Sequence, residues 1–165
     1  MNRRAEIALT PGEATAFLAA QPTVTCATRG HDGWPHLMPL WFVVRGEELW
    51  SWTYAKSEKV RNLERDPRCT LQVEAGVVYD ELRGLMLRCE ARIHRDTETV
   101  ADLGLALMRR YAGWQGHAAG PPPHGAPAEQ LPPAVEAMVR RQAPKRVALQ
   151  FVERGRISWD HGKLG

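Results

Sequence analysis

Apolar and polar residues alternate along much of the chain between Thr23 and His94, and this period of two predicts β-strands. The expected strands cover residues 23–28, 36–44, 49–53, 68–74, 82–94 and 147–152. Asp32-Gly33 and Gly46 lie in the first two connections, where glycine allows the positive φ of a tight hairpin turn. Because these strands do not alternate regularly with helices, we expect a six-stranded antiparallel sheet.

Helices are expected at other connections, where apolar residues recur three or four positions apart. Thr10-Pro11-Gly12-Glu13 has the pattern of a capping box and precedes a short helix over residues 14–20. Ser57 is the expected cap of a second helix, which Asp66-Pro67 ends because the residue before proline avoids the helical region. A third helix follows Asp96, and its apolar face holds Val100, Leu103, Leu107 and Tyr111.

Residues 113–133 interrupt the pattern, since they contain half of the chain's 12 prolines together with several glycines. This density excludes regular structure and predicts a loop insertion, followed by one or two helical turns over residues 135–142. The length of 165 residues fits one domain, which we expect to cover residues 1–165. The spacing of the 3 cysteines fits neither a redox pair nor a zinc site, so we expect buried, reduced thiols.

The net charge of +3 and the pI of about 9.0 raise the question of a nucleic-acid partner. The cations concentrate at one helix start and do not form a stripe with interleaved aromatic residues, so we expect no such partner. No apolar run is long enough for a membrane span and no secretory signal follows Met1, which predicts a cytoplasmic protein. The six histidines lack metal-ligand spacing, so we expect no metal site.

The segment after the strand over residues 49–53 places Lys56, Lys59 and Arg61 around the start of the second helix. Cations are unfavourable at a helix N-terminus unless an anion compensates them, and a phosphate held by free amides would do so. Thr53 and Ser57 supply hydroxyl groups for such an anion. The alternative is a surface helix in which glutamates neutralise the cations through weak pairs. The charge pattern alone leaves both readings open.

Three segments, in this order, resemble the pyridoxamine 5′-phosphate oxidase-like split-barrel family. The central one runs from Trp52-Thr53 through Lys56-Ser57-Glu58-Lys59 to Arg65-Asp66-Pro67-Arg68 and is similar to the segment that wraps a cofactor phosphate. Residues 32–42 resemble the strand whose backbone lines the flavin ring, and residues 157–165 resemble the tail of one branch of the family. The resemblance covers residues 23–94 and 147–165.

The resemblance implies a mainly β (α+β) fold, a six-stranded antiparallel split β-barrel with short flanking helices. It also implies a homodimer with the cofactor at the interface between subunits. Lys59 would be the main phosphate cation, the strand before Phe42 would line the ring, and Trp159 would cover it across the interface. The implied cofactor-binding residues are Met38, Pro39, Leu40, Trp41, Thr53, Lys56, Ser57, Lys59, Arg61, Asn62 and Trp159.

The chain departs from the true oxidases of this family in ways that argue against vitamin B6 oxidation. Trp41-Phe42 stands where they carry a second lysine, Glu58 stands where they carry an arginine, and their substrate-binding terminus is missing. The resemblance therefore implies hydride transfer from reduced coenzyme F420 to a small organic substrate, with FMN as the alternative cofactor. A non-catalytic cofactor carrier remains open, as does a haem-binding protein with His36 or His161 as axial ligand. No catalytic residue is assigned, because the cofactor carries the chemistry.

Overall fold

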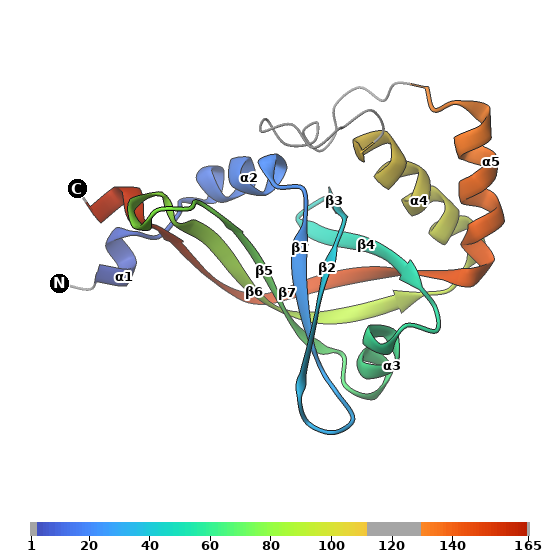
Figure 1. Cartoon of the computed structure of the whole chain (residues 1–165), viewed down its shortest axis with the longest axis horizontal. Helices are drawn as coiled ribbons and strands as arrows, with labels where there is room; N and C mark the ends of the chain where they lie inside the picture. The colour runs from blue at the N-terminus through green and yellow to red at the C-terminus, as the bar shows by residue number, and fades with distance from the viewer. Residues whose placement is uncertain (1–2, 112–129, 165) are drawn as a thin grey trace.

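The computed structural model describes residues 3–111 and 130–164, which include a seven-stranded antiparallel sheet with flanking helices (Figure 1). The strand order is β2-β1-β5-β6-β7-β4-β3. The strands are β1 (Val24–Arg29), β2 (Pro35–Leu40), β3 (Phe42–Arg45), β4 (Glu48–Tyr54), β5 (Arg68–Ala75), β6 (Arg83–His94) and β7 (Arg146–Asp160).

The sheet curls into a split half-barrel because its two edge strands are joined by one residue. β2 and β3 stand at opposite ends of the strand order, yet only Trp41 separates them along the chain. Leu40 pairs with Val24 of β1, whereas Phe42 pairs with Ser51 of β4. The prediction of a single strand over residues 36–44 is therefore wrong, and the sheet has seven strands where six were expected.

The helices are α1 (Arg3–Glu6), α2 (Pro11–Ala20), α3 (Glu58–Arg65), α4 (Thr97–Tyr111) and α5 (Pro133–Gln142), with short 3-10 turns at Tyr79–Glu81 (η1), Ala143–Lys145 (η2) and His161–Leu164 (η3). The helices α2 to α5 are close to the predicted ones, whereas the short helix α1 was not predicted (Figure 1). The predicted capping box at α2 is confirmed, since the Thr10 amide donates to the Glu13 carboxylate and the Glu13 amide donates to the Thr10 hydroxyl. The four apolar residues predicted for one face of α4 are all buried.

The predicted loop insertion over residues 113–133 falls largely outside the described residues, which resume at residue 130. At its end the structure differs from the prediction, because Pro133 is already the first residue of α5. Proline is well suited to a first helical position, where its missing amide would have had no intrahelical acceptor. The helix therefore begins two residues earlier than the apolar pattern suggested.

The strands β5, β6 and β7 extend beyond the half-barrel as an arm, with α1 and η3 near its tip (Figure 1). The pairing of β6 with β7 runs from His94 opposite Ala148 to Arg83 opposite Asp160, with a register shift between Arg88 and Cys89. The last strand was predicted to end at residue 152, but β6 offers backbone partners as far as Asp160. Side-chain alternation beyond residue 152 was too weak to reveal this extension.

The interior of the half-barrel is apolar and also contains the cysteines. Cys26, Cys69 and Cys89 are all buried and none forms a disulfide, as the sequence predicted. Burial is the main cause that raises the pKa of Cys89 to about 12, so this thiol stays protonated at neutral pH. None of the helices in the described ranges combines the length and the apolar composition needed to cross a membrane.

Candidate cofactor site

The start of α3 offers hydrogen-bond donors that no described protein group uses. The amides of Val60 and Arg61 both donate to the Ser57 carbonyl, so the amides of Glu58 and Lys59 precede the first intrahelical bond. Ser57 occupies the N-cap position, but its side chain makes no capping bond. Its hydroxyl oxygen is buried and has no hydrogen-bond partner within the described residues. A buried polar group of this kind is costly unless a ligand or water completes it.

Lys59 lies in the first turn of α3 with its ammonium group inside the protein. The residue is only 7% exposed, and Nζ donates to Thr53 Oγ1 at 3.1 Å. An ammonium group has three donors, so two remain without a described protein partner. Burial lowers the pKa of Lys59 from 10.5, because the charged form loses its water. An anion at the start of α3 would relieve this cost.

Arg61 and Asn62, two other predicted phosphate ligands, point their polar groups to different partners. Arg61 lies 3.8 Å from the Glu58 carboxylate on the exposed side of α3. Asn62 is fully buried, and its amide donates to Thr28 Oγ1 at 3.0 Å. Lys56 is exposed. The exposed side of α3 thus resembles the surface-helix alternative. On its buried side Lys59 donates to Thr53, and the Ser57 hydroxyl is buried at the N-cap.

The strand predicted to line the cofactor ring is an exposed edge of the sheet. Met38 and Trp41 are about half exposed, at 41% and 45%, and Leu40 is buried. The Trp41 ring stacks on Tyr111 of α4, with 4.3 Å between ring centroids and 2° between the planes. The Tyr111 hydroxyl accepts from the Phe42 amide at 3.1 Å and lies 2.8 Å from the Pro22 carbonyl, to which it donates. Tyr111 therefore holds the connection between β2 and β3 in place.

Arg146 is a residue at this site that the sequence analysis missed. Its guanidinium carbon lies 4.0 Å from the Tyr54 ring centroid and 4.1 Å from that of Trp52, at the end of β4. Two of its nitrogens donate to Gln142 Oε1, at 3.0 and 2.7 Å. The neighbouring Lys145 carbonyl accepts from the Ala55 amide, which ties this cation to the loop before Ser57. The one sequence feature that could have identified Arg146 as a site residue is the basic pair Lys145-Arg146 at the start of the last strand.

We expect Arg146→Gln to weaken binding of a phosphate-bearing cofactor by severalfold. The substitution removes a cation beside the loop and its stacking on two rings, each worth about 0.5–1 kcal/mol at a partly exposed position. Fluorescence titration with the cofactor would measure the change. Arg141→Gln, on the neighbouring helix α5, removes the same charge without a ring contact and should leave the affinity unchanged. Equal losses in both variants would contradict a specific role for Arg146.

Trp159 lies far from the other predicted site residues within one chain. It pairs with Gly84 near the tip of the arm, whereas α3 lies at the opposite side of the molecule (Figure 1). A Cβ atom at Gly84 would come within 2.5 Å of the Trp159 ring, so the glycine makes room for the indole on the sheet. The structure therefore brings Trp159 to an exposed arm and not to Lys59.

The two histidines considered as haem ligands lie on different elements. His36 is on β2, and its Nδ1 atom is buried without a hydrogen-bond partner in the described structure. His161 is in η3, where Nδ1 lies 3.1 Å from the Tyr79 carbonyl and the two rings are in contact. In residues 3–111 and 130–164, no group of three or more His, Cys, Asp or Glu side chains is arranged to hold a metal ion.

Comparisons with known proteins agree with this architecture. A family model described as pyridoxamine 5′-phosphate oxidase matches residues 10–151. No curated protein sequence matches the chain. The crystal structure of the conserved hypothetical protein Rv2991 from Mycobacterium tuberculosis is 36% identical, with a TM-score of 0.82, and the match covers 98% of this chain and 91% of that one.

Two more distant structures share the fold. An F420 reductase is 23% identical, with a TM-score of 0.57, over 84% of this chain and 92% of its own. The haem storage protein HutZ from Vibrio cholerae is 16% identical, with a TM-score of 0.64, over 92% of this chain and 97% of its own. The same fold thus occurs in proteins with different ligands. The family match and the half-barrel together show that the chain belongs to the pyridoxamine 5′-phosphate oxidase-like family of split-barrel proteins.

Proposed function

We propose that the protein binds the phosphate of coenzyme F420 at the start of α3 and is an oxidoreductase that reduces a small organic molecule, with FMN as the alternative cofactor. The observation that carries this proposal is the buried Ser57 hydroxyl, which has no hydrogen-bond partner among the described residues, together with the buried Lys59 in the first turn of the same helix. Free helix amides, a hydroxyl and a lysine are the groups that hold phosphates at helix N-termini. The residues present therefore fit a phosphate-bearing cofactor.

The chain's own residues have separate tasks in this proposal. Lys59 and Ser57 hold the phosphate, and the ring lies along the exposed edge of β2 beside Met38 and Trp41. When bound, the cofactor supplies the hydride. Trp41, fixed by its stacking on Tyr111, shields that edge from water. Two features support coenzyme F420 over vitamin B6 chemistry: the apolar Trp41-Phe42 pair and the carboxylate of Glu58 at the helix start.

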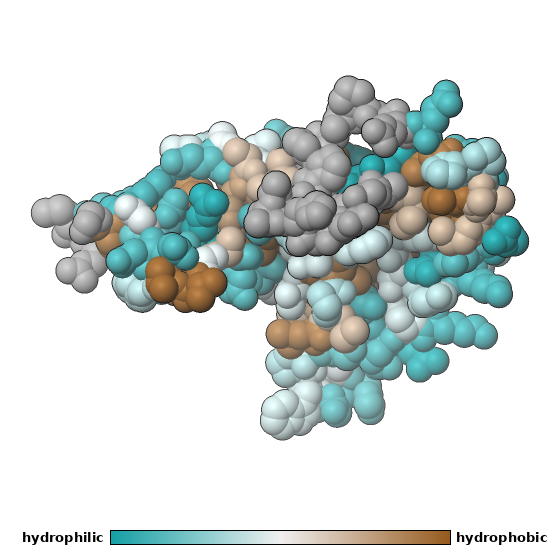
Figure 2. Space-filling view, turned by 45° about the horizontal axis from the view of Figure 1, so that its top comes forward, coloured by the Kyte–Doolittle hydropathy of each residue, from teal (hydrophilic) through white to brown (hydrophobic). Residues whose placement is uncertain are grey.

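A homodimer is the second part of the proposal, because it would bring the arm to the cofactor edge. Two sets of large apolar side chains are exposed, and Figure 2 shows separate apolar areas on the molecular surface. One set lies on β2 and its connections and comprises Trp34, Leu37, Met38 and Trp41; the other lies on the arm and comprises Val77, Val78, Tyr79 and Ile157. In a two-fold dimer each set can cover the other, and the partner subunit's Trp159 would then lie over the ring.

Titration of the purified protein with coenzyme F420, FMN and haem would test the proposal. We expect saturable binding of coenzyme F420 at one site per chain, detected by fluorescence anisotropy, and turnover of a nitro- or enone-bearing test acceptor by the reduced coenzyme. Tight binding of FMN with weak binding of coenzyme F420 would favour the alternative cofactor. A Soret band on haem addition that disappears in a His36→Ala variant would favour a haem protein. Binding of none of the three would overturn the proposal.

A further inference from the structure

Asn62 is a polar residue in the middle of α3 whose side chain is completely buried. Asparagine is a poor helix former, and an apolar side chain would pack a buried position at less cost. The other buried residues of this helix are Lys59 and the apolar Val60 and Leu63. The stability of α3 alone therefore does not account for an asparagine at this position, and its hydrogen bonds lead from the helix into the sheet.

The groups around Asn62 fix the direction of each of these hydrogen bonds. The Arg65 guanidinium can only donate, so its Nη2 atom requires Asn62 Oδ1 as the acceptor. The amide nitrogen of Asn62 then faces β1 and donates to Thr28 Oγ1 at 3.0 Å. The Thr28 hydroxyl donates in turn to the His36 carbonyl of β2, at 3.4 Å. These bonds form one chain from α3 through β1 to β2.

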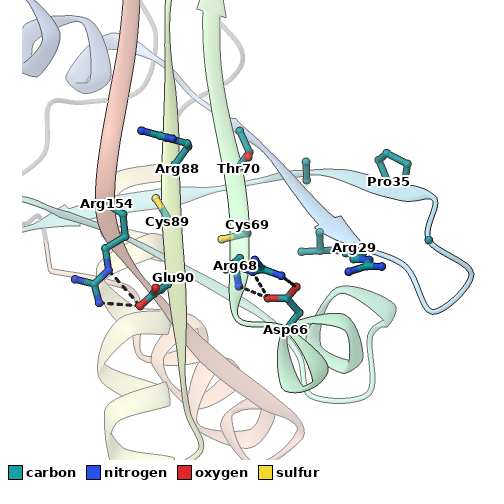
Figure 3. Close-up of a pocket in the computed structure, with 13 residues that line it drawn as sticks. Arg29, Pro35, Asp66, Arg68, Cys69, Thr70, Arg88, Cys89, Glu90 and Arg154 are labelled. Carbon is teal, nitrogen blue, oxygen red and sulfur yellow. Dashed lines mark hydrogen bonds and ion pairs between the residues drawn. The ribbon is translucent and has the colours of Figure 1, made fainter.

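The chain of hydrogen bonds lies where α3 packs against β1. Figure 3 labels two neighbours of this contact: Arg29, which follows Thr28 in β1, and Asp66, which follows α3. Thr28 is 3% exposed and Asn62 is fully buried, so water does not compete for the bond between them. A hydrogen bond in such surroundings is strong, and either group is costly to leave without its partner. The contact therefore favours one position of α3 on the sheet.

The same chain joins the two parts of the proposed cofactor site. Lys59 is three residues before Asn62 and is buried on the same side of the helix, so the Asn62 bond holds the turn that carries the ammonium group. His36 is two residues before Met38 on the same face of β2, the strand proposed to lie along the ring. The bonds thus run from the turn proposed to bind the phosphate to the strand proposed to bind the ring.

We propose that Asn62 is a positioning residue, which acts through Thr28 to hold the first turn of α3 at a fixed distance from the edge of β2. The inference rests on the proposed function, and it gives Asn62 a task in that site other than contact with the phosphate. A ligand that carries a ring and a phosphate gains most affinity when the separation of its two subsites is fixed before it binds. The phosphate should therefore contribute less to affinity when the chain is broken.

The contribution of the phosphate is the ratio of two dissociation constants, measured by fluorescence titration of the full chain. One pair of ligands is coenzyme F420 and the same deazaflavin without the phosphate and the groups beyond it; FMN and riboflavin are the pair for the alternative cofactor. We expect the wild-type protein to bind the phosphate-bearing member of one pair roughly 10- to 100-fold tighter.

Thr28→Val and Asn62→Leu should each lower this ratio about fivefold, because the subsites are no longer held together. The affinity for the phosphate-free ligand should change less than twofold. Thr70→Val is the matched control for the threonine substitution, since Thr70 pairs with Ala27 and lies on the opposite face of the sheet from Thr28. Its ratio should equal that of the wild-type protein.

The double variant Thr28→Val/Asn62→Leu separates positioning from a structural role. Each single substitution leaves a buried polar group without its partner and should lower the thermal unfolding midpoint, whereas replacing both partners by apolar side chains restores much of it. We expect the double variant to regain stability and to keep a reduced ratio, no lower than that of either single variant. Recovery of the ratio together with the midpoint would overturn the proposal, because the contact would then be structural only.

The remaining outcomes distinguish this inference from the proposed function. A ratio that falls in Asn62→Leu but not in Thr28→Val would make Asn62 a direct phosphate ligand and overturn the inference. A wild-type ratio that persists in every variant would also overturn it and would leave the phosphate site at α3 intact. A wild-type ratio near one for both ligand pairs would contradict the proposed function, and the inference with it.

Discussion

Lys59→Met should weaken binding of coenzyme F420 by roughly 10- to 100-fold, since a hydrogen bond between charged groups contributes about 1.5–3 kcal/mol. The ammonium group is buried and donates to a single acceptor among the described residues, so its other two donors are available to the bound anion. Methionine keeps most of the side-chain volume and avoids a cavity. Anisotropy titration of both proteins with the coenzyme would measure the ratio of dissociation constants.

The same variant should be more stable than the wild-type protein in the absence of the cofactor. A buried cation with a single hydroxyl partner destabilises the native state, and methionine removes that cost. Arg141→Met is the control, because Arg141 is exposed on α5 and outside the predicted site, so its replacement should change stability and affinity little. A Lys59→Met protein that is less stable and unchanged in affinity would contradict the phosphate site. It would favour the alternative in which α3 is a surface helix without a ligand.

The stability difference should also depend on pH in a defined direction. Burial lowers the pKa of Lys59 below 10.5, so between the native and the unfolded pKa the unfolded chain binds more protons at this residue. The penalty is complete below the native pKa and disappears as the pH rises towards 10.5. We therefore expect the advantage of Lys59→Met in the free energy of unfolding to shrink over this range, as measured by urea denaturation at several pH values.

Tyr111→Phe should lower the free energy of unfolding by about 1–3 kcal/mol, the cost of leaving buried polar groups without a partner. The change keeps the ring that stacks on Trp41 and removes only the hydroxyl that bonds to the Phe42 amide and the Pro22 carbonyl. Because this hydroxyl holds the connection between β2 and β3, we also expect weaker binding of the cofactor along that edge.

Tyr79→Phe is the control for this prediction, because Tyr79 is 65% exposed and contacts His161 through its ring and carbonyl. Its free energy of unfolding should match that of the wild-type protein. Urea denaturation followed by tryptophan fluorescence would measure both variants. An equal and small effect of the two substitutions would mean that water replaces the Tyr111 hydroxyl at no cost.

Local sequence patterns predicted the elements whose stability is local. The capping box at Thr10 and the apolar spacing of α4 are confirmed because each depends on residues of a single helix and its cap. The split of residues 36–44 at Trp41 depends instead on which strands flank each half, and those partners lie elsewhere in the chain. The extension of β7 to Asp160 likewise depends on β6, which provides the hydrogen bonds.

In the candidate site, too, residues close together in the sequence could be predicted, and residues brought in by strand pairing could not. Lys59 donates to Thr53 and Ser57 is the N-cap of α3, because all three lie on one strand–loop–helix unit, and their role in holding a phosphate stays a prediction. Arg146 was missed since it reaches this unit only through the pairing of β7 with β4. A cleft on the sheet is lined by arginines from four strands, namely Arg29, Arg68, Arg88 and Arg154, and no spacing along the chain connects them (Figure 3). Residues that strand pairing brings together from distant parts of the chain could therefore not be predicted from the sequence.

The one-residue connection at Trp41 has a consequence for the order in which the protein folds. The β1–β2 and β3–β4 hairpins are local and can form early, with Trp41 as a short tether between them. Closure of the half-barrel must wait for β7, which pairs with both β4 and β6 and is the last strand along the chain. Until β7 is synthesised, β4 and β6 expose unpaired edges on which a nascent chain can aggregate.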